Sequence, residues 1–95
     1  MPTKNAVPRW VDDRLQHLSP QVLYDESRRQ VEKWGIQRRT PFEWMCYLTE
    51  EVGELAEAIS EMVYRGGRPE AVEREGIHAA TVALKIAEMS MQGGE

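Results

Sequence analysis

The chain has 95 residues, of which 41% are hydrophobic and 29% are charged, a composition typical of soluble globular domains and not of disordered chains. Its net charge of −4 argues against a general binder of polymeric nucleic acid, and no apolar run approaches the roughly 20 residues that a membrane span needs. The polar start MPTKN does not resemble a signal peptide, and the single cysteine, Cys46, has no partner for an intrachain disulfide. We therefore expect one small domain in a cytoplasmic, reducing setting.

Residues 1–18 contain two prolines and charges of both signs, and we expect them to form a loosely ordered arm ahead of a helical domain at 19–95. The first helix start is Ser19-Pro20, a capping hydroxyl followed by a proline at the first helical position. This helix is predicted to run to Gly35, because glycine commonly follows the last helical residue. Four apolar residues are expected to share one of its sides: Leu23, Tyr24, Val31 and Trp34.

A stronger helix start follows at Thr40-Pro41, where Glu43 completes a capping box three residues after the threonine. The second helix is predicted to run to about Arg65, because Gly66-Gly67 follows it. Its apolar residues recur at alternating spacings of three and four, which predicts one amphipathic stripe. The stripe consists of Met45, Leu48, Val52, Leu55, Ile59 and Met62.

The stretch EEVGELAEAISE, residues 50–61, places five glutamates on this second helix, although like charges three or four residues apart repel one another. At roughly 100° per residue, Glu50, Glu57 and Glu61 fall nearly opposite the apolar stripe. Glu51 and Glu54 instead form an i, i+3 pair turned toward one shoulder of the helix. Either water solvates a plain acidic face, or a cation lies among these carboxylates.

A third helix is predicted to begin at Pro69 and to continue as far as Gly93-Gly94. Between Ile77 and Met91 it is apolar on most sides, which is typical of a buried helix. Because so small a protein supplies few partners for such a helix, we expect a homo-oligomer, a dimer or a tetramer, built as a helical bundle. The polar residues of this helix fall within one stripe: Glu75, His78, Thr81, Lys85 and Glu88.

Two pairs of polar residues have the same spacing: Glu51-x-x-Glu54 on the second helix and Glu75-x-x-His78 on the third. Residues three apart project from one helix face, and the short connection GGRP allows antiparallel neighbours to bring the two pairs together. Several carboxylates at one point repel unless a cation neutralises them, and Mg²⁺ suits oxygen ligands and substrate phosphates. The pattern indicates metal-assisted attack of water on a phosphate chain. The sequence has no glycine-rich phosphate loop, so phosphate binding is expected to depend on the metal and on basic side chains.

The segment LTEEVGELAEAI closely resembles the first metal-binding helix of the MazG-like, all-α nucleoside triphosphate pyrophosphatases. Members of that superfamily carry a Glu-x-x-Glu pair and then, on the next helix, a Glu-x-x-Asp pair. The segment RRQVEKWGIQ is similar to phage and bacterial members of the short MazG-like group. The resemblance covers roughly residues 20–92 and implies an all-α antiparallel bundle with three main helices per chain, completed by homo-oligomerisation.

The resemblance also implies an activity, the hydrolysis of a nucleoside triphosphate between its α and β phosphates to give a monophosphate and pyrophosphate. Transferred to this chain, the family pattern makes Glu51, Glu54 and Glu75 ligands of Mg²⁺. His78 stands where the superfamily has aspartate, and Mg²⁺ accepts an imidazole nitrogen less readily than Mn²⁺ or Zn²⁺ does. The expected cofactor is therefore Mg²⁺ or Mn²⁺, with His78 as the fourth ligand.

Roles for the remaining polar residues are less sharply indicated by the pattern. Glu50 can reach Glu54 at i, i+4, so it is a further candidate ligand, and either Glu50 or Glu51 is a candidate base that orients the attacking water. Trp44 projects toward the same shoulder as Glu51, so it is a candidate to stack on a nucleobase, although aromatic residues at helical spacing more often pack in a core. Basic residues that could bind the phosphates are Lys85, Arg38 and Arg39.

Three other interpretations fit the same residues. The chain could be a helical interaction module that has the fold without catalysis, which the histidine at position 78 favours. It could act on phosphoribosyl-ATP, a substrate of the same superfamily. It could also bind a metal without turnover.

Overall fold

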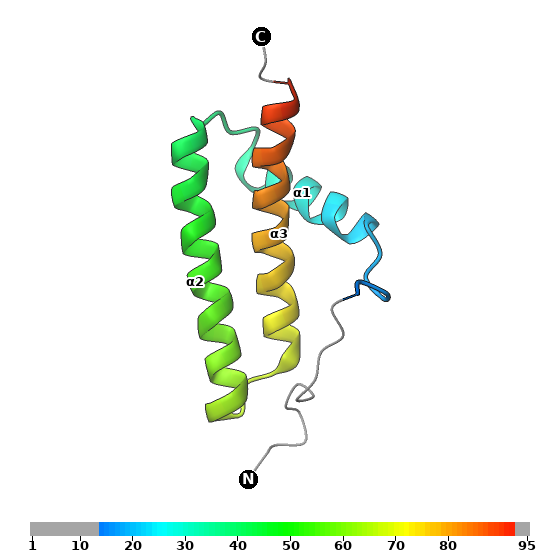
Figure 1. Cartoon of the computed structure of the whole chain (residues 1–95), viewed down its shortest axis with the longest axis vertical. Coiled ribbons are helices and arrows are strands. Elements are labelled where there is room, and N and C mark those ends of the chain that lie inside the picture. Colours follow the sequence, from blue (N-terminus) through cyan, green and yellow to red (C-terminus); the bar gives the residue numbers. More distant parts are fainter. Residues whose placement is uncertain (1–13, 93–95) are drawn as a thin grey trace.

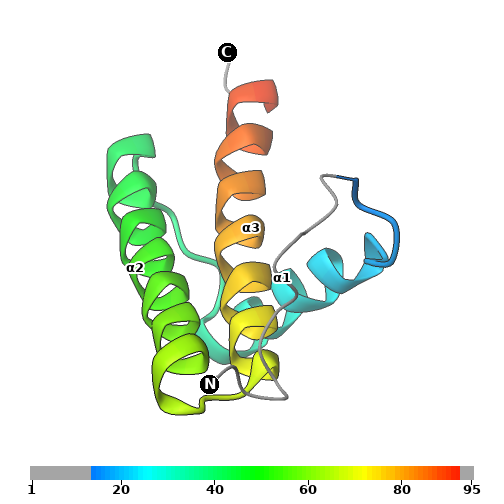
Figure 2. The ribbon, with the colours of Figure 1, turned by 60° about the horizontal axis from the view of Figure 1, so that its bottom comes forward.

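The computed structural model describes residues 14–92, and these residues fold into three helices and no strand. The helices are α1 (Gln21–Trp34), α2 (Pro41–Arg65) and α3 (Pro69–Gln92). α2 and α3 lie side by side and antiparallel, while α1 runs across α3 at a steep angle (Figure 1). A second view shows the same arrangement, with α3 in the middle of the molecule (Figure 2). α3 is therefore the helix on which the other two pack.

Both ends of α2 lie where the sequence predicts them. Thr40 Oγ1 accepts a hydrogen bond from the Glu43 backbone N–H at 3.2 Å, and Glu43 Oε1 accepts one from the Thr40 N–H at 2.8 Å. This is a complete capping box, and it satisfies backbone donors that the first turn of a helix leaves unpaired. The C-terminal end is closed by Gly66, whose φ of 73° is a left-handed conformation that suits glycine.

The bounds predicted for α1 and the start predicted for α3 are confirmed within a residue, while the end predicted for α3 at Gly93-Gly94 lies outside the described residues. α1 begins at Gln21, directly after Pro20, and the Ser19 hydroxyl accepts a hydrogen bond from the Gln21 N–H at 3.3 Å. α1 ends at Trp34, immediately before Gly35. Of the arm expected at 1–18, residues 14–18 are exposed and non-helical, and residues 1–13 lie outside the described range.

The buried apolar core of residues 14–92 is small and lies mainly between α2 and α3. Its buried members are Trp44, Met62, Ala79 and Val82, of which Met62 and Val82 are fully buried. The apolar stripe predicted on α2 divides into two parts, because α3 covers only one side of it. Met62 is 1% exposed, whereas Val52 and Ile59 are 50% and 43% exposed. None of the helices in residues 14–92 is both long and apolar enough to cross a membrane.

The apolar side predicted for α1 is wrong for most of its members. Tyr24, Val31 and Trp34 are exposed, and the helix instead buries Glu26 and Gln30 against α3. The reason is the polarity of the α3 surface on which α1 packs. His78 of α3 pairs with Glu26, and Lys85 of α3 pairs with Gln30. Helical periodicity describes a helix by itself and does not include the chemistry of the surface that receives it.

Candidate metal centre

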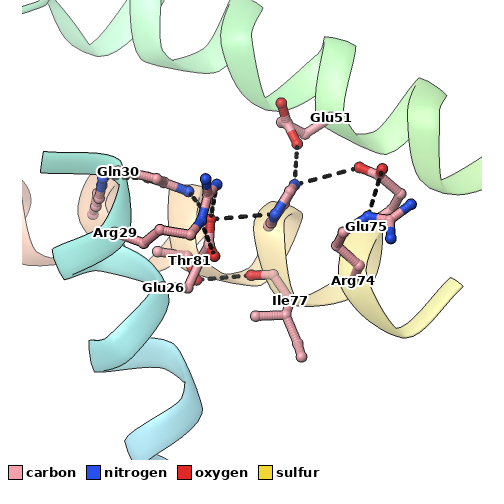
Figure 3. Close-up of polar contacts among 10 residues, drawn as sticks. Glu26, Arg29, Gln30, Glu51, Arg74, Glu75, Ile77 and Thr81 are labelled. Atoms are coloured by element: carbon pink, nitrogen blue, oxygen red, sulfur yellow. Dashed lines mark hydrogen bonds and ion pairs between the residues drawn. The ribbon is translucent and has the colours of Figure 1, made fainter. Parts of the chain in front are cut away.

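Glu51 of α2 and the pair Glu75 and His78 of α3 come together in the middle of the molecule. One ligand atom from each of the three lies within 4.8 Å of the others. His78 Nδ1 is 3.4 Å from Glu75 Oε1 and 3.7 Å from Glu51 Oε2. Figure 3 shows Glu51 reaching down from α2 toward the α3 residues. Because α2 and α3 are antiparallel and joined by only three residues, 66–68, they bring side chains 24 residues apart to one point.

Glu54, the second member of the pair predicted on α2, lies at the open edge of this cluster. Its side chain is exposed. Partial desolvation raises the pKa of Glu54, and the neighbouring carboxylate of Glu75 raises this pKa further. Glu50 is also exposed and is not a member of the cluster. The structure therefore brings three of the four paired residues together, with the fourth beside them.

Two carboxylate oxygens in the cluster are buried without a hydrogen-bond donor among residues 14–92: Glu51 Oε2 and Glu75 Oε1. The other oxygen of Glu75 lies 3.7 Å from Arg74 Nε, so only Oε1 faces the cluster unpaired. Burial raises the pKa of Glu51, and the charge of Glu54 adds to this rise. Unpaired buried oxygens of this kind are uncommon, because they lose hydration without gaining a partner. Carboxylate oxygens with no donor are suitable ligands for a divalent cation.

A third carboxylate, which the sequence analysis missed, approaches His78 from α1. Glu26 Oε2 lies 3.3 Å from His78 Nε2. Glu26 is buried and accepts hydrogen bonds from Arg29 Nε at 2.9 Å, Arg29 Nη2 at 2.8 Å and Gln30 Nε2 at 2.8 Å. The hydrogen bonds from Arg29 hold the pKa of Glu26 below its ordinary value. The sequence does contain a signal for this contact, because Arg29 and Gln30 follow Glu26 at the three- and four-residue spacings that allow side-chain hydrogen bonds on a helix.

Lys85, a predicted phosphate ligand, lies on α3 beside this network. Its Nζ donates a hydrogen bond to Gln30 Oε1 and lies 5.7 Å from the centre of the Trp44 ring. Burial lowers the pKa of Lys85.

Trp44 and the arginines of the α1–α2 connection lie at the same end of the molecule. Trp44 is buried and packs against Tyr47, with ring centres 5.9 Å apart. The Arg39 guanidinium lies over both rings, at 5.2 Å from Trp44 and 5.1 Å from Tyr47. Arg38 is exposed. Arg39 is thus held against the two aromatic rings, whereas no such ring contact is seen for Arg38 among residues 14–92.

A cavity of about 300 Å³ opens between the end of α1, the start of α2 and the end of α3. Its lining is aromatic with several polar groups: Gln30, Trp34, Trp44, Tyr47, Lys85 and Glu88. The cavity is connected to the cluster by consecutive polar contacts from Lys85 to Gln30, from Gln30 to Glu26, and from Glu26 to His78. Ring faces next to a cation and amide groups can receive a planar polar ligand.

Comparison with known proteins gives no further assignment, since no family model, no curated protein and no solved structure matches the chain.

Proposed function

We propose that this protein is a metal-dependent nucleoside triphosphate pyrophosphohydrolase, which converts a ribo- or deoxynucleoside triphosphate and water into the monophosphate and pyrophosphate. The observation that carries the proposal is the convergence of Glu51, Glu75 and His78 from two antiparallel helices, with two buried oxygens that have no donor in the described part of the chain. Glu51 and Glu54 belong to the segment LTEEVGELAEAI that resembles the MazG-like pyrophosphatases.

The residues that would hold a divalent cation are Glu51, Glu54, Glu75 and His78. Three carboxylates and an imidazole form a donor set suited to Mg²⁺ or, because of the nitrogen, to Mn²⁺. When bound, the cation supplies positive charge for the triphosphate and lowers the pKa of a water molecule.

The chain itself supplies the groups that orient and deprotonate the attacking water. Of the two candidate bases, Glu51 is the better placed, since Glu50 is exposed and lies outside the cluster. The raised pKa of Glu51 makes this carboxylate a stronger base than an ordinary glutamate. The proton of the attacking water would therefore pass to the Glu51 carboxylate.

The cavity beside the cluster is the proposed place of the nucleoside. Trp34 lines the cavity and is 59% exposed, so it offers a ring face to the base, whereas Trp44 is buried and contributes to the cavity wall. Lys85 and Arg39 offer positive charge to the phosphates. The network from Lys85 to His78 puts the cavity and the candidate metal centre within one connected set of side chains.

A homo-oligomer, a dimer or a tetramer, is part of the proposal, because one side of α2 stays uncovered. Val52, Ile59 and Val63 are 43–50% exposed and, with Met45, occupy one side of the helix; these four residues are called the open apolar face below. A second copy of the chain packed on this face would bury it and complete a helical bundle.

One observation favours the rival proposal of a helical interaction module without catalysis. His78 lies between Glu26, Glu51 and Glu75, so a protonated imidazole could neutralise these carboxylates without a metal. In that case the cluster would be a structural ion-pair network, and no nucleotide would be hydrolysed.

The test is pyrophosphate release from a panel of ribo- and deoxynucleoside triphosphates and phosphoribosyl-ATP, first with Mg²⁺ and then with Mn²⁺. The variant Glu51→Gln/Glu54→Gln, prepared in the same way, controls for a contaminating enzyme. Release by the parent protein but not by the variant supports the proposal, and the preferred compound identifies the substrate. Folded parent protein that releases no pyrophosphate with either ion would overturn it in favour of the interaction module.

A further inference from the structure

The imidazole of His78 is held between carboxylates on opposite sides of the ring. Nε2 lies 3.3 Å from Glu26 Oε2 on α1, and Nδ1 lies 3.4 Å from Glu75 Oε1 and 3.7 Å from Glu51 Oε2. The two ring nitrogens therefore have different surroundings. Nε2 faces a carboxylate that is already hydrogen-bonded, and Nδ1 faces two oxygens for which residues 14–92 supply no donor.

Glu26 is held in place by groups other than His78. Arg29 and Gln30 donate three hydrogen bonds to its carboxylate, with distances from 2.8 to 2.9 Å. All three residues lie on α1, so these bonds fix the carboxylate relative to its own helix. Glu26 is also buried against α3, and Gln30 is fixed in turn by Lys85 of α3. The contact with His78 thus comes from an acceptor whose position is set by the fold.

We propose that Glu26 is a positioning residue that directs Nδ1 of His78 toward Glu51 and Glu75, and that the resulting centre binds Mn²⁺-like transition-metal ions in preference to Mg²⁺. The inference rests on the metal centre proposed above, and it adds a residue from α1 and a choice of ion.

The chemistry of neutral imidazole gives the physical reason. A neutral imidazole carries one N–H, and an acceptor beside one nitrogen draws the proton there and leaves the lone pair on the other. A cation held by Glu51 and Glu75 would take the lone pair of Nδ1, and Glu26 would then face the proton that stays on Nε2. Histidine ligands in metal sites commonly donate their second ring N–H to a carboxylate in this way. A nitrogen donor among carboxylates favours transition-metal ions, whereas Mg²⁺ favours oxygen alone.

The experiment compares the parent with Glu26→Ala, Glu26→Gln and His78→Asp. Glu32→Ala is the matched control, because Glu32 is an exposed glutamate on the same helix. Calorimetry measures the Kd of Mn²⁺ and of Mg²⁺ for each protein without nucleotide. Pulsed electron paramagnetic resonance of bound Mn²⁺ then detects the nuclear coupling of a directly bound imidazole nitrogen. Far-ultraviolet circular dichroism checks that each variant is folded.

For the parent we expect Mn²⁺ to bind at least about 10-fold more tightly than Mg²⁺, with nitrogen coupling. Glu26→Ala should weaken Mn²⁺ binding by about 10- to 100-fold, while Glu26→Gln, which keeps an acceptor oxygen, should lose less. Glu32→Ala should bind as the parent does. His78→Asp should remove the nitrogen coupling, which excludes His17 as its source, and should shift the preference toward Mg²⁺.

Either of two results overturns the inference while the metal centre stands. In the first, the parent binds Mn²⁺ but shows no nitrogen coupling. In the second, folded Glu26→Ala binds Mn²⁺ as tightly as the parent does. Should Glu26→Ala fail to fold, equal Mn²⁺ affinities of Glu26→Gln and the parent overturn the inference in its place. If neither ion binds the parent, the metal centre fails together with the inference.

Discussion

Helix α2 buries a charged residue on one side and exposes apolar residues on another. On the side toward α3, Glu51 is a buried carboxylate with an oxygen that finds no donor within residues 14–92. On another side, the open apolar face exposes Val52 and Ile59 by about half of their surfaces. A buried carboxylate without a donor and an exposed apolar stripe are both costly for a chain by itself.

Under the proposal above, each of the two sides receives a partner from outside the single chain. A partner for the carboxylate cluster needs positive charge. A partner for the open apolar face needs a hydrophobic surface. A divalent cation would satisfy the first, and a second copy of the chain would satisfy the second. The first three predictions below remove one partner or one side of this comparison, and the fourth is a control away from both sides.

The largest effect is expected from Glu51→Gln on catalysis. Loss of the carboxylate removes a metal ligand and the proposed base, so the rate of pyrophosphate release should fall by about 100-fold or more. Initial rates at saturating Mn²⁺ measure the change. Glu57→Gln, an exposed glutamate on the same helix, is the control and should keep the parent rate. Equal rates for Glu51→Gln and the parent would contradict the role of Glu51.

The next effect concerns the open apolar face. Val52→Glu/Ile59→Glu should convert the oligomer into monomers, because two apolar side chains that would be buried at about 1.5–3 kcal/mol each become charged. This corresponds to a Kd of association at least about 100-fold higher. Light scattering coupled to size-exclusion chromatography measures the mass, with Ser60→Glu as an exposed control on the same helix. A parent that is monomeric at high concentration would show that this face has another partner or none.

A smaller effect is expected on stability without metal. In EDTA, Glu51→Gln should be more stable than the parent by about 1 kcal/mol, since it removes a buried charge from a cluster of like charges. For a domain of this size the melting temperature should rise by about 4–8 °C. Addition of Mn²⁺ should stabilise the parent and not the variant, because only the native parent binds it. A lower melting temperature for the variant in EDTA would show that His78 already neutralises the cluster.

The smallest effect is expected at the N-terminal end of α2, away from both sides compared above, and it serves as a control. Hydrogen bonds with Thr40 lower the pKa of Glu43 from its ordinary value of 4.5. A carboxyl whose pKa is lower in the folded state stabilises the fold above its unfolded pKa, and this contribution is lost as pH falls through the folded pKa. The parent should therefore be more stable than Glu43→Gln at neutral pH, and the difference should disappear in acid. Melting temperatures of both proteins between pH 7 and about pH 3 measure it, and a difference independent of pH would contradict the capping role.

Local features of the sequence were sufficient to predict the three helices and their ends. Thr40, Glu43 and Gly66 act within a few residues of the chain, so their effects can be identified without knowledge of tertiary structure. The convergence of Glu51 with the pair on α3 was also accessible, because a short connection between antiparallel helices leaves few possible arrangements.

The position of α1 could not be obtained in the same way. Its buried residues, Glu26 and Gln30, are polar and pair with residues 52 to 55 positions later in the chain. A periodicity argument selects the apolar side, and here that side is exposed at Tyr24 and Trp34. The part of the candidate centre that depends on α1 therefore became visible only with the fold.

The most direct test of the central claim is ³¹P nuclear magnetic resonance of the four deoxynucleoside triphosphates incubated with the protein and Mn²⁺. The account predicts that the parent produces monophosphate and pyrophosphate signals, and that Glu51→Gln/Glu54→Gln leaves the triphosphates intact. Unchanged triphosphates with folded parent, or equal turnover by the double variant, would contradict it.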